Sequence, residues 1–209
     1  MVRVSIPQEQ VDCQNWVGAN WVSGNGETLE IECPLTGKKL GTLNGTTASD
    51  LDACIANSSE AARQWASVSI KERCAVMFRT RDILLRDCDA ISHVVSSESG
   101  KTFGESKAGL LKGIEVLEYA LSLQNLDSGG RMEVSNGVYC EYRREPLGVV
   151  AGITPFNFPA MVPMWMIPIA LTLGNAFIWK PSEKTPLTSK LLAQAFHEAG
   201  LPAGVLNVV

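Results

Sequence analysis

Two short segments carry the side chains of this sequence that could take part in chemistry. The first is TPFNFP at residues 154–159, directly after the apolar run 148–153, and the second is KPSEK at 180–184, directly after the apolar run 176–179. Asn157 is the one carboxamide in the mostly apolar first segment. Its N–H groups could donate to an oxyanion that develops in a reaction. A lone loop asparagine more often satisfies only nearby backbone groups.

Lys180 and Glu183 stand three residues apart at the start of the second segment. A lysine donates hydrogen bonds and a carboxylate accepts them, so the pair could hold the two vicinal hydroxyls of a ribose. From these residues alone, a solvated ion pair before Pro186 is the simpler interpretation. The sequence contains no GxGxxG, GxxxxGK[ST], GxSxG or HExxH pattern, so the residues by themselves define no reaction.

The flanking apolar runs predict how the two segments are positioned. Runs 148–153 and 176–179 are continuous and apolar, as buried parallel strands are, and the apolar stretch 160–173 between them predicts a helix. Pro163 and Pro168 predict a kink in that helix, which is also shorter than the ~20 residues that span a bilayer. Ligands of open α/β sheets bind at the carboxyl ends of the strands, so both segments are expected at one sheet edge.

The rest of the chain is predicted to alternate strands and helices. Residues 14–42 predict a small antiparallel layer, 131–144 predict a hairpin that turns at Asn136-Gly137, and 205–209 predict a further strand. The first predicted helix is capped by Thr47 or Ser49 and runs to about Ser67, and the second begins with a Ser69–Glu72 capping box. The third covers 89–98, and the fourth runs from Thr102 or Phe103 to about Leu123. The last predicted helix covers 190–199.

The spacing of apolar residues predicts which helix faces are buried. The first helix carries along one face Leu51, Cys54, Ile55, Ser58 and Ala62. The second helix is expected to keep its arginines in solvent and to turn inward Cys74, Met77, Phe78, Ile83 and Leu84. Gly109 and Gly113, four residues apart, could permit close packing or the approach of a ligand.

Composition excludes several classes of function. The chain has 209 residues, of which 45% are hydrophobic and 19% charged, so it can bury a sizeable core. A formal net charge of −4 without a lysine or arginine cluster argues against a nucleic-acid partner. Six dispersed cysteines and two histidines predict reduced structural thiols and no metal site. The first residues lack the apolar core of a secretion signal, and we expect no membrane partner.

Several spaced motifs occur in a fixed order along residues 146–209, namely TPFNFP, Gly174-Asn175, WKPSE at 179–183 and GLPAGVLN at 200–207, and they are preceded by PLTG at 34–37, Gln64-Trp65 and ESGK at 98–101. On these motifs the sequence resembles the aldehyde dehydrogenase superfamily. Phe156 and the run 161–168 are similar to the CoA-acylating methylmalonate-semialdehyde (malonate-semialdehyde) dehydrogenase subgroup, since many other relatives have Trp in place of Phe156.

The resemblance implies a domain organisation and a reaction. Residues 1–130 would supply the N-terminal β layer and helices of a Rossmann-like NAD-binding domain, 131–144 an oligomerisation hairpin that makes a homo-oligomer (dimer or tetramer), and 145–209 the first half of the Rossmann-like core. A cysteine thiolate would attack a small-molecule aldehyde and hydride would pass to NAD. The thioester would pass to coenzyme A as the substrate carboxylate leaves as carbon dioxide.

The resemblance also implies a role for particular residues. Thr154 and Phe156 would line the cofactor cleft, and Asn157 would donate to the oxyanion. Lys180 and Glu183 would hold the adenosine ribose, with Lys184 beside them. Lys112 takes the place of a subgroup arginine that meets the substrate carboxylate, and a lysine keeps the charge but loses the bidentate fork.

None of the six cysteines stands in the family's nucleophile motif, so the chain is expected to be the N-terminal part of an enzyme and to be inactive alone. Two other functions stay open at this stage, namely a non-acylating NAD-dependent aldehyde dehydrogenase and a truncated, non-catalytic relative that binds nucleotide or a full-length subunit. The expected location is a reducing compartment, the cytoplasm or the mitochondrial matrix.

Overall fold

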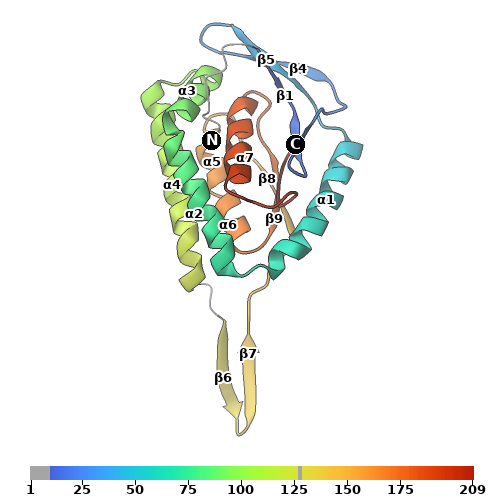
Figure 1. Ribbon diagram of the computed structural model, residues 1–209, viewed down its shortest axis with the longest axis vertical. Coiled ribbons are helices and arrows are strands. Elements are labelled where there is room, and N and C mark those ends of the chain that lie inside the picture. Colours follow the sequence, from blue (N-terminus) through green and yellow to red (C-terminus); the bar gives the residue numbers. More distant parts are fainter. Residues whose placement is uncertain (1–9, 127–128) are drawn as a thin grey trace.

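The computed structural model describes residues 10–126 and 129–209 and gathers most of them around a five-stranded sheet (Figure 1). The strand order of this sheet is β3-β2-β10-β9-β8. Three strands pair in parallel, namely β8 (Val149–Ile153), β9 (Ala176–Lys180) and β10 (Leu206–Val208). A parallel centre with helices packed against it confirms the α/β class that the apolar runs predict, and it agrees with the Rossmann-like arrangement that the family resemblance implies.

The N-terminal strands differ from the sequence-based expectation. They are β1 (Val11–Cys13), β2 (Asn15–Val17), β3 (Asn20–Val22), β4 (Thr28–Glu32) and β5 (Lys39–Asn44). The prediction of one antiparallel layer over 14–42 is wrong, because β2 and β3 join the central sheet through antiparallel pairing of β2 with β10. β4 and β5 instead form a second sheet, where β1 pairs in parallel with β5. Local alternation of apolar and polar residues predicts that two neighbouring strands pair with each other. It cannot predict pairing with a strand at the far end of the chain.

Most helices begin and end close to their predicted bounds, but the helix predicted over 190–199 begins four residues earlier, at Pro186. The helices are α1 (Ala48–Ser67), α2 (Ile70–Arg86), α3 (Cys88–Ser99), α4 (Phe103–Leu126), α5 (Met161–Met164), α6 (Ile167–Thr172) and α7 (Pro186–Glu198). Thr47 with Asp50 and Ser69 with Glu72 form complete capping boxes at α1 and α2. Gly100 ends α3 in the left-handed conformation, with φ of 73°.

The buried faces predicted for α1 and α2 are confirmed at most positions, namely Cys54, Ser58, Ala62, Cys74, Met77 and Leu84, and are wrong at a few others. Phe78 on α2 is 49% exposed, whereas Arg73 is buried. The Arg73 guanidinium lies inside because its Nε donates to the Thr172 carbonyl oxygen at 2.8 Å and so satisfies an acceptor at the end of α6. On α1, Leu51 and Ile55 are likewise exposed, since that helix turns its small residues and Trp65 toward the sheet.

The predicted single kinked helix over 160–173 is two short helices, α5 and α6. Between them, Trp165 and Met166 donate their backbone N–H groups to carbonyls three residues back, those of Val162 and Pro163, which tightens the turn. Pro168 stands in the first turn of α6, where its missing N–H costs nothing. The apolar segment therefore changes direction directly after the TPFNFP loop.

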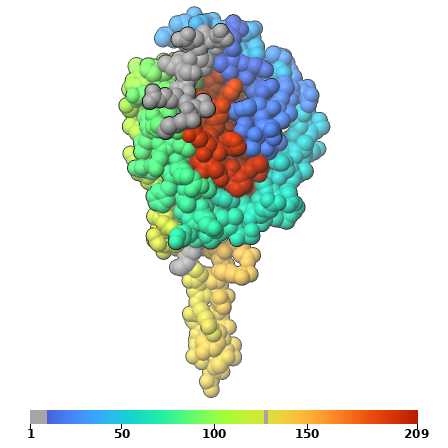
Figure 2. All heavy atoms as spheres, in the orientation of Figure 1, coloured from blue at the N-terminus to red at the C-terminus, as the bar shows by residue number. Residues whose placement is uncertain are grey.

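A two-stranded hairpin projects from the body of the protein (Figures 1 and 2). β6 (Gly130–Ser135) pairs antiparallel with β7 (Val138–Tyr142), and Gly137 in the turn has a φ of 73°. The two strands span residues 130–142, so the hairpin begins one residue before the predicted segment 131–144 and ends two residues before the end of that segment. Within the described residues, no helix has both the length and the apolar character needed to cross a lipid bilayer.

Candidate functional site

The two polar loops start side by side at the carboxyl edge of the parallel sheet. The register of β8 against β9 pairs Ile153 with Lys180, and the Thr154 backbone N–H donates to the Lys180 carbonyl at 3.1 Å. At the other end of the strands, the Asn175 side-chain oxygen accepts from the backbone N–H groups of Leu147 and Gly148 at 2.7 and 3.2 Å. Asn175 thus aligns the two strands, and their polar loops emerge level with each other.

Thr154 ties the first loop to the second strand. The indole Nε1 of Trp179 donates to the Thr154 hydroxyl oxygen at 2.8 Å, and both side chains are buried. Because four of the five residues of β9 are buried, Lys180 is the first residue of that strand to emerge into solvent. The buried hydrogen bond therefore fixes where both loops leave the sheet.

Phe156 and Asn157 lie exposed at the tip of the first loop. The Lys184 ammonium lies 4.9 Å from the centre of the Phe156 ring, so a cation–π contact joins the two loops. No group in the described part of the chain hydrogen-bonds to the Asn157 carboxamide. The alternative in which Asn157 only satisfies loop backbone groups therefore has no contact to support it, and its oxyanion role stays a prediction.

Lys180 and Glu183 form an ion pair of 3.2 Å, and each side chain is about half exposed. The backbone N–H of Glu183 itself, and then the Lys180 ammonium, hold the pKa of the Glu183 carboxyl below its ordinary value. Glu183 is thus a carboxylate at neutral pH. The loop is closed by the Ser182 hydroxyl, which accepts from the Lys184 backbone N–H at 3.2 Å.

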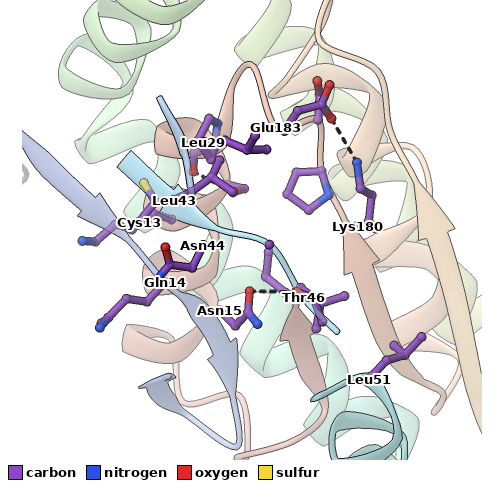
Figure 3. Close-up of a pocket in the computed structure, with 18 of the residues that line it drawn as sticks. Cys13, Gln14, Asn15, Leu29, Leu43, Asn44, Thr46, Leu51, Lys180 and Glu183 are labelled. Atoms are coloured by element: carbon purple, nitrogen blue, oxygen red, sulfur yellow. Dashed lines mark hydrogen bonds and ion pairs between the residues drawn. The ribbon is translucent and has the colours of Figure 1, made fainter. Parts of the chain in front are cut away.

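A cavity of about 510 Å³ opens beside this ion pair (Figure 3). It is lined by Lys180, Glu183 and neighbouring residues of the second loop, and by parts of the chain at 13–15, 43–48 and 208–209. Figure 3 shows Asn15 and Thr46 opposite the ion pair, joined by a hydrogen bond of 3.2 Å from the Thr46 hydroxyl. These N-terminal residues were missed by sequence reasoning, because no local pattern indicates that β5 and the start of α1 face the second loop.

Cys13 also lines the cavity, but its thiol is not reactive. Burial raises the pKa of the Cys13 thiol to about 12, so the group stays protonated at neutral pH. The hydrophobic lining around it suits the flat apolar face of a base or another ring. The cavity is thus better suited to binding than to nucleophilic attack.

The structure brings together most, but not all, of the predicted site residues. Thr154, Phe156, Lys180, Glu183 and Lys184 lie in the two adjacent loops. Asn157 directly follows Phe156 in the first loop. Lys112 does not line the cavity; it lies exposed on α4 in a 2.5 Å ion pair with Glu115.

Comparison with known proteins assigns the fold and its loops to a family. The model of the aldehyde dehydrogenase family matches residues 21–209, and the chain belongs to that family. It is 41% identical over 198 residues to malonate-semialdehyde dehydrogenase 2 of Geobacillus thermodenitrificans, covering 94% of this chain and 41% of the relative. It is also 41% identical over 198 residues to a malonate-semialdehyde dehydrogenase of Lacticaseibacillus casei, covering 94% of this chain and 40% of the relative.

Solved structures support the same assignment. A structure from Sinorhizobium meliloti, named as a methylmalonate-semialdehyde dehydrogenase complexed with NAD, superimposes with a TM-score of 0.94 at 35% identity, over 97% of this chain and 42% of that one. A methylmalonate-semialdehyde dehydrogenase from Oceanimonas doudoroffii gives a TM-score of 0.93 at 35% identity, over 96% and 41% of the two chains. The chain therefore spans about two fifths of the length of these relatives.

Proposed function

We propose that the cavity beside the second loop binds the adenosine part of NAD. The Lys180 ammonium would donate to the ribose hydroxyls and the Glu183 carboxylate would accept from them. The observation that carries this proposal is the half-exposed Lys180–Glu183 pair at the edge of a cavity of about 510 Å³, at the carboxyl ends of parallel strands. Bound NAD would supply the hydride acceptor.

The residues of the two loops would divide the remaining tasks. Thr154, held by Trp179, fixes the start of the first loop, while Phe156 and Lys184 form one wall of the cleft. The low pKa of Glu183 keeps a negative charge where a 2′-phosphate would bind, which favours NAD over NADP. The exposed Asn157 carboxamide would donate to the developing oxyanion of the substrate.

Calorimetric titration of the 209-residue chain with NAD and NADP tests the nucleotide site. Lys180→Met and Glu183→Gln should each weaken NAD binding by roughly tenfold, since each removes a charged hydrogen-bonding group. Glu183→Gln should also narrow the preference for NAD over NADP. The matched controls Lys39→Met and Glu30→Gln break another exposed ion pair, of 2.6 Å, and should leave NAD binding unchanged.

We further propose that the whole enzyme oxidises malonate or methylmalonate semialdehyde to an acyl-CoA through a cysteine thioester. The names of the relatives support the semialdehyde, and the similarity of Phe156 and 161–168 to the acylating subgroup supports coenzyme A as co-substrate. A chimera in which residues 10–209 replace the matched segment of the Geobacillus relative tests both points. We expect NADH formation from malonate semialdehyde that requires coenzyme A. Equal rates without it would favour the non-acylating alternative, and an inactive but folded chimera would favour a non-catalytic role.

In the same chimera, Lys112 tests where the substrate carboxylate binds. If Lys112 meets that carboxylate, Lys112→Arg should lower the KM for the semialdehyde, because the guanidinium offers a bidentate fork. The exposed position of Lys112 and its pairing with Glu115 make this the least supported of the predicted site residues. An unchanged KM would remove Lys112 from the site. The 209-residue chain alone is expected to form no NADH.

The hairpin would join copies of the chain into a dimer or tetramer. Its exposed apolar side chains are each more than half exposed and include Met132, Val134, Val138, Tyr139 and Tyr142. Such an apolar ribbon with open edges favours pairing with another chain. The relatives named above are bacterial, so the cytoplasm remains the proposed location and the mitochondrial matrix finds no support.

A further inference from the structure

The turn at the end of α3 contacts the TPFNFP loop on one side and, on the other, the first turn of α7, the helix that follows the KPSEK loop. Its first residue, Glu98, is 2% exposed. One carboxylate oxygen of Glu98 accepts from the backbone N–H of Leu187 at 2.8 Å, and the other accepts from the Thr188 N–H at 2.9 Å and from the Thr188 hydroxyl. Glu98 therefore caps α7 from a distant part of the sequence.

This cap replaces the local one that α7 lacks. Thr185 occupies the N-cap position, but its side chain makes no capping hydrogen bond. Glu98 supplies the missing acceptor and places a carboxylate at the positive end of the helix dipole. Since α7 begins directly after the KPSEK loop, the anchored first turn of α7 fixes the end of the loop that carries Lys180 and Glu183.

The last residue of the turn, Lys101, reaches the other loop. Its ammonium lies 3.5 Å from the centre of the Phe158 ring, and Phe158 directly follows Asn157. Lys101 is half-buried at this contact, and the burial lowers the pKa of its ammonium. Cation–π attraction is stronger when the cation is desolvated. Lys101 thus holds the TPFNFP loop from the side of α4.

Gly100 stands between the two side chains and ends α3 in the left-handed conformation. Its φ of 73° is a conformation that other residues rarely adopt, and an added Cβ would lie 3.0 Å from Pro34. The turn is further held by the Ser96 hydroxyl, which donates to the Lys101 carbonyl at 2.6 Å.

We propose that the turn Glu98-Ser99-Gly100-Lys101 is a clamp that positions both loops of the nucleotide site relative to each other. Glu98 and Lys101 act as positioning residues, because their contacts hold Leu187, Thr188 and Phe158. The effect of the clamp on NAD binding rests on the nucleotide site proposed above, whereas its effect on loop mobility does not.

Hydrogen–deuterium exchange of the 209-residue chain, followed by mass spectrometry at pH 8, tests the clamp directly. Glu98→Gln places the N–H₂ group of a side-chain carboxamide against a backbone N–H of α7, so one hydrogen bond of the cap is lost. The backbone N–H groups at 181–188 should then exchange roughly tenfold faster, because this segment opens locally more often. Lys101→Met should do the same at 156–162, and Lys101→Arg should restore slow exchange, because a guanidinium also binds an aromatic face.

Two variants control for cap and charge loss elsewhere. Glu72→Gln alters the capping box of α2, and Lys107→Met breaks an α4 ion pair with Asp89 of 2.7 Å. Both should leave exchange at 156–162 and 181–188 within about twofold of the parent protein.

Calorimetry then links the clamp to function. Glu98→Gln and Lys101→Met should each weaken NAD binding about tenfold while Glu72→Gln and Lys107→Met do not. Unchanged exchange rates at both loops in folded Glu98→Gln and Lys101→Met would overturn the clamp. If the Glu98→Gln protein does not fold, the exchange rate at 156–162 in Lys101→Met decides. Faster loop exchange in a chain that does not bind NAD would instead uphold the clamp and refute the nucleotide site.

Discussion

Alanine substitutions at Gly113 and Gly109, one helical turn apart on α4, should change stability in opposite directions. A Cβ on Gly113 would lie 2.9 Å from Cβ and 3.1 Å from Cγ of Met164, and 3.4 Å from the Ala160 carbonyl oxygen. The Met164 Cβ is bound to the backbone, so relief requires α5 to move. A Cβ on Gly109 would meet only Cδ1 of Phe158, at an ordinary contact distance of 3.9 Å.

The magnitudes follow from two opposing contributions. Replacing glycine by alanine inside a helix stabilises by about 1 kcal/mol, and overpacking costs about 1–3 kcal/mol. Gly109→Ala should therefore gain up to about 1 kcal/mol. Gly113→Ala should lose about 1 kcal/mol net, so the two variants should differ by about 2 kcal/mol.

Urea unfolding followed by tryptophan fluorescence measures this difference as a free energy of unfolding. Thermal unfolding should show Gly113→Ala melting several degrees below Gly109→Ala, since about 1 kcal/mol corresponds to ~2–4 °C in a domain of this size. A Gly113→Ala protein as stable as Gly109→Ala would refute the close packing of α4 on α5.

Three further outcomes can be measured independently. Burial raises the pKa of the Glu98 carboxyl from 4.5 to about 7. The folded protein therefore binds the carboxyl proton more tightly than the unfolded chain does. The stability that this proton contributes is complete below pH 4.5 and is lost as pH rises through 7. The stability of the parent protein minus that of Glu98→Gln should thus fall by about 3 kcal/mol from pH 4.5 to 7.5, and a flat difference would contradict the burial effect. Trp65→Phe should cost about 1–3 kcal/mol in urea unfolding, because the buried Leu171 carbonyl loses its 2.8 Å donor, and no loss would argue against that bond. If the hairpin joins copies of the chain as proposed, Val138→Arg should reduce the sedimentation coefficient to that of a monomer, and an unchanged assembly would place the interface outside the hairpin.

The parts of the fold that could be predicted are those specified by neighbouring residues. The cap at Thr47, the capping box at Ser69 and the turn at Gly137 all depend on residues within a few positions of one another. The burial of Arg73 could not be predicted in this way, because its acceptor is a carbonyl of α6. The same limit applies to the hairpin of β2 and β3, because pairing of β2 with the distant strand β10 determines which sheet the hairpin joins.

The candidate site likewise has parts that neighbouring residues predict and parts that depend on distant contacts. Its two loops could be found because each follows a continuous apolar run, and parallel pairing then brings them to one edge. The cavity wall at 43–48 could not be found, since it depends on how β5 and α1 pack against the second loop. Glu98 was visible only as part of a family resemblance, and its contacts with Leu187 and Thr188 give it a physical role.

Chemical-shift mapping of the isotopically labelled chain during titration with NAD tests the central claim most directly. If the two loops form the nucleotide site, the largest shifts should fall on residues 180–184, on 154–156 and on the cavity wall at 43–48, and Lys180→Met should weaken the titration. Shifts that leave all three segments unaffected, or an equal titration in Lys180→Met, would contradict the proposed site.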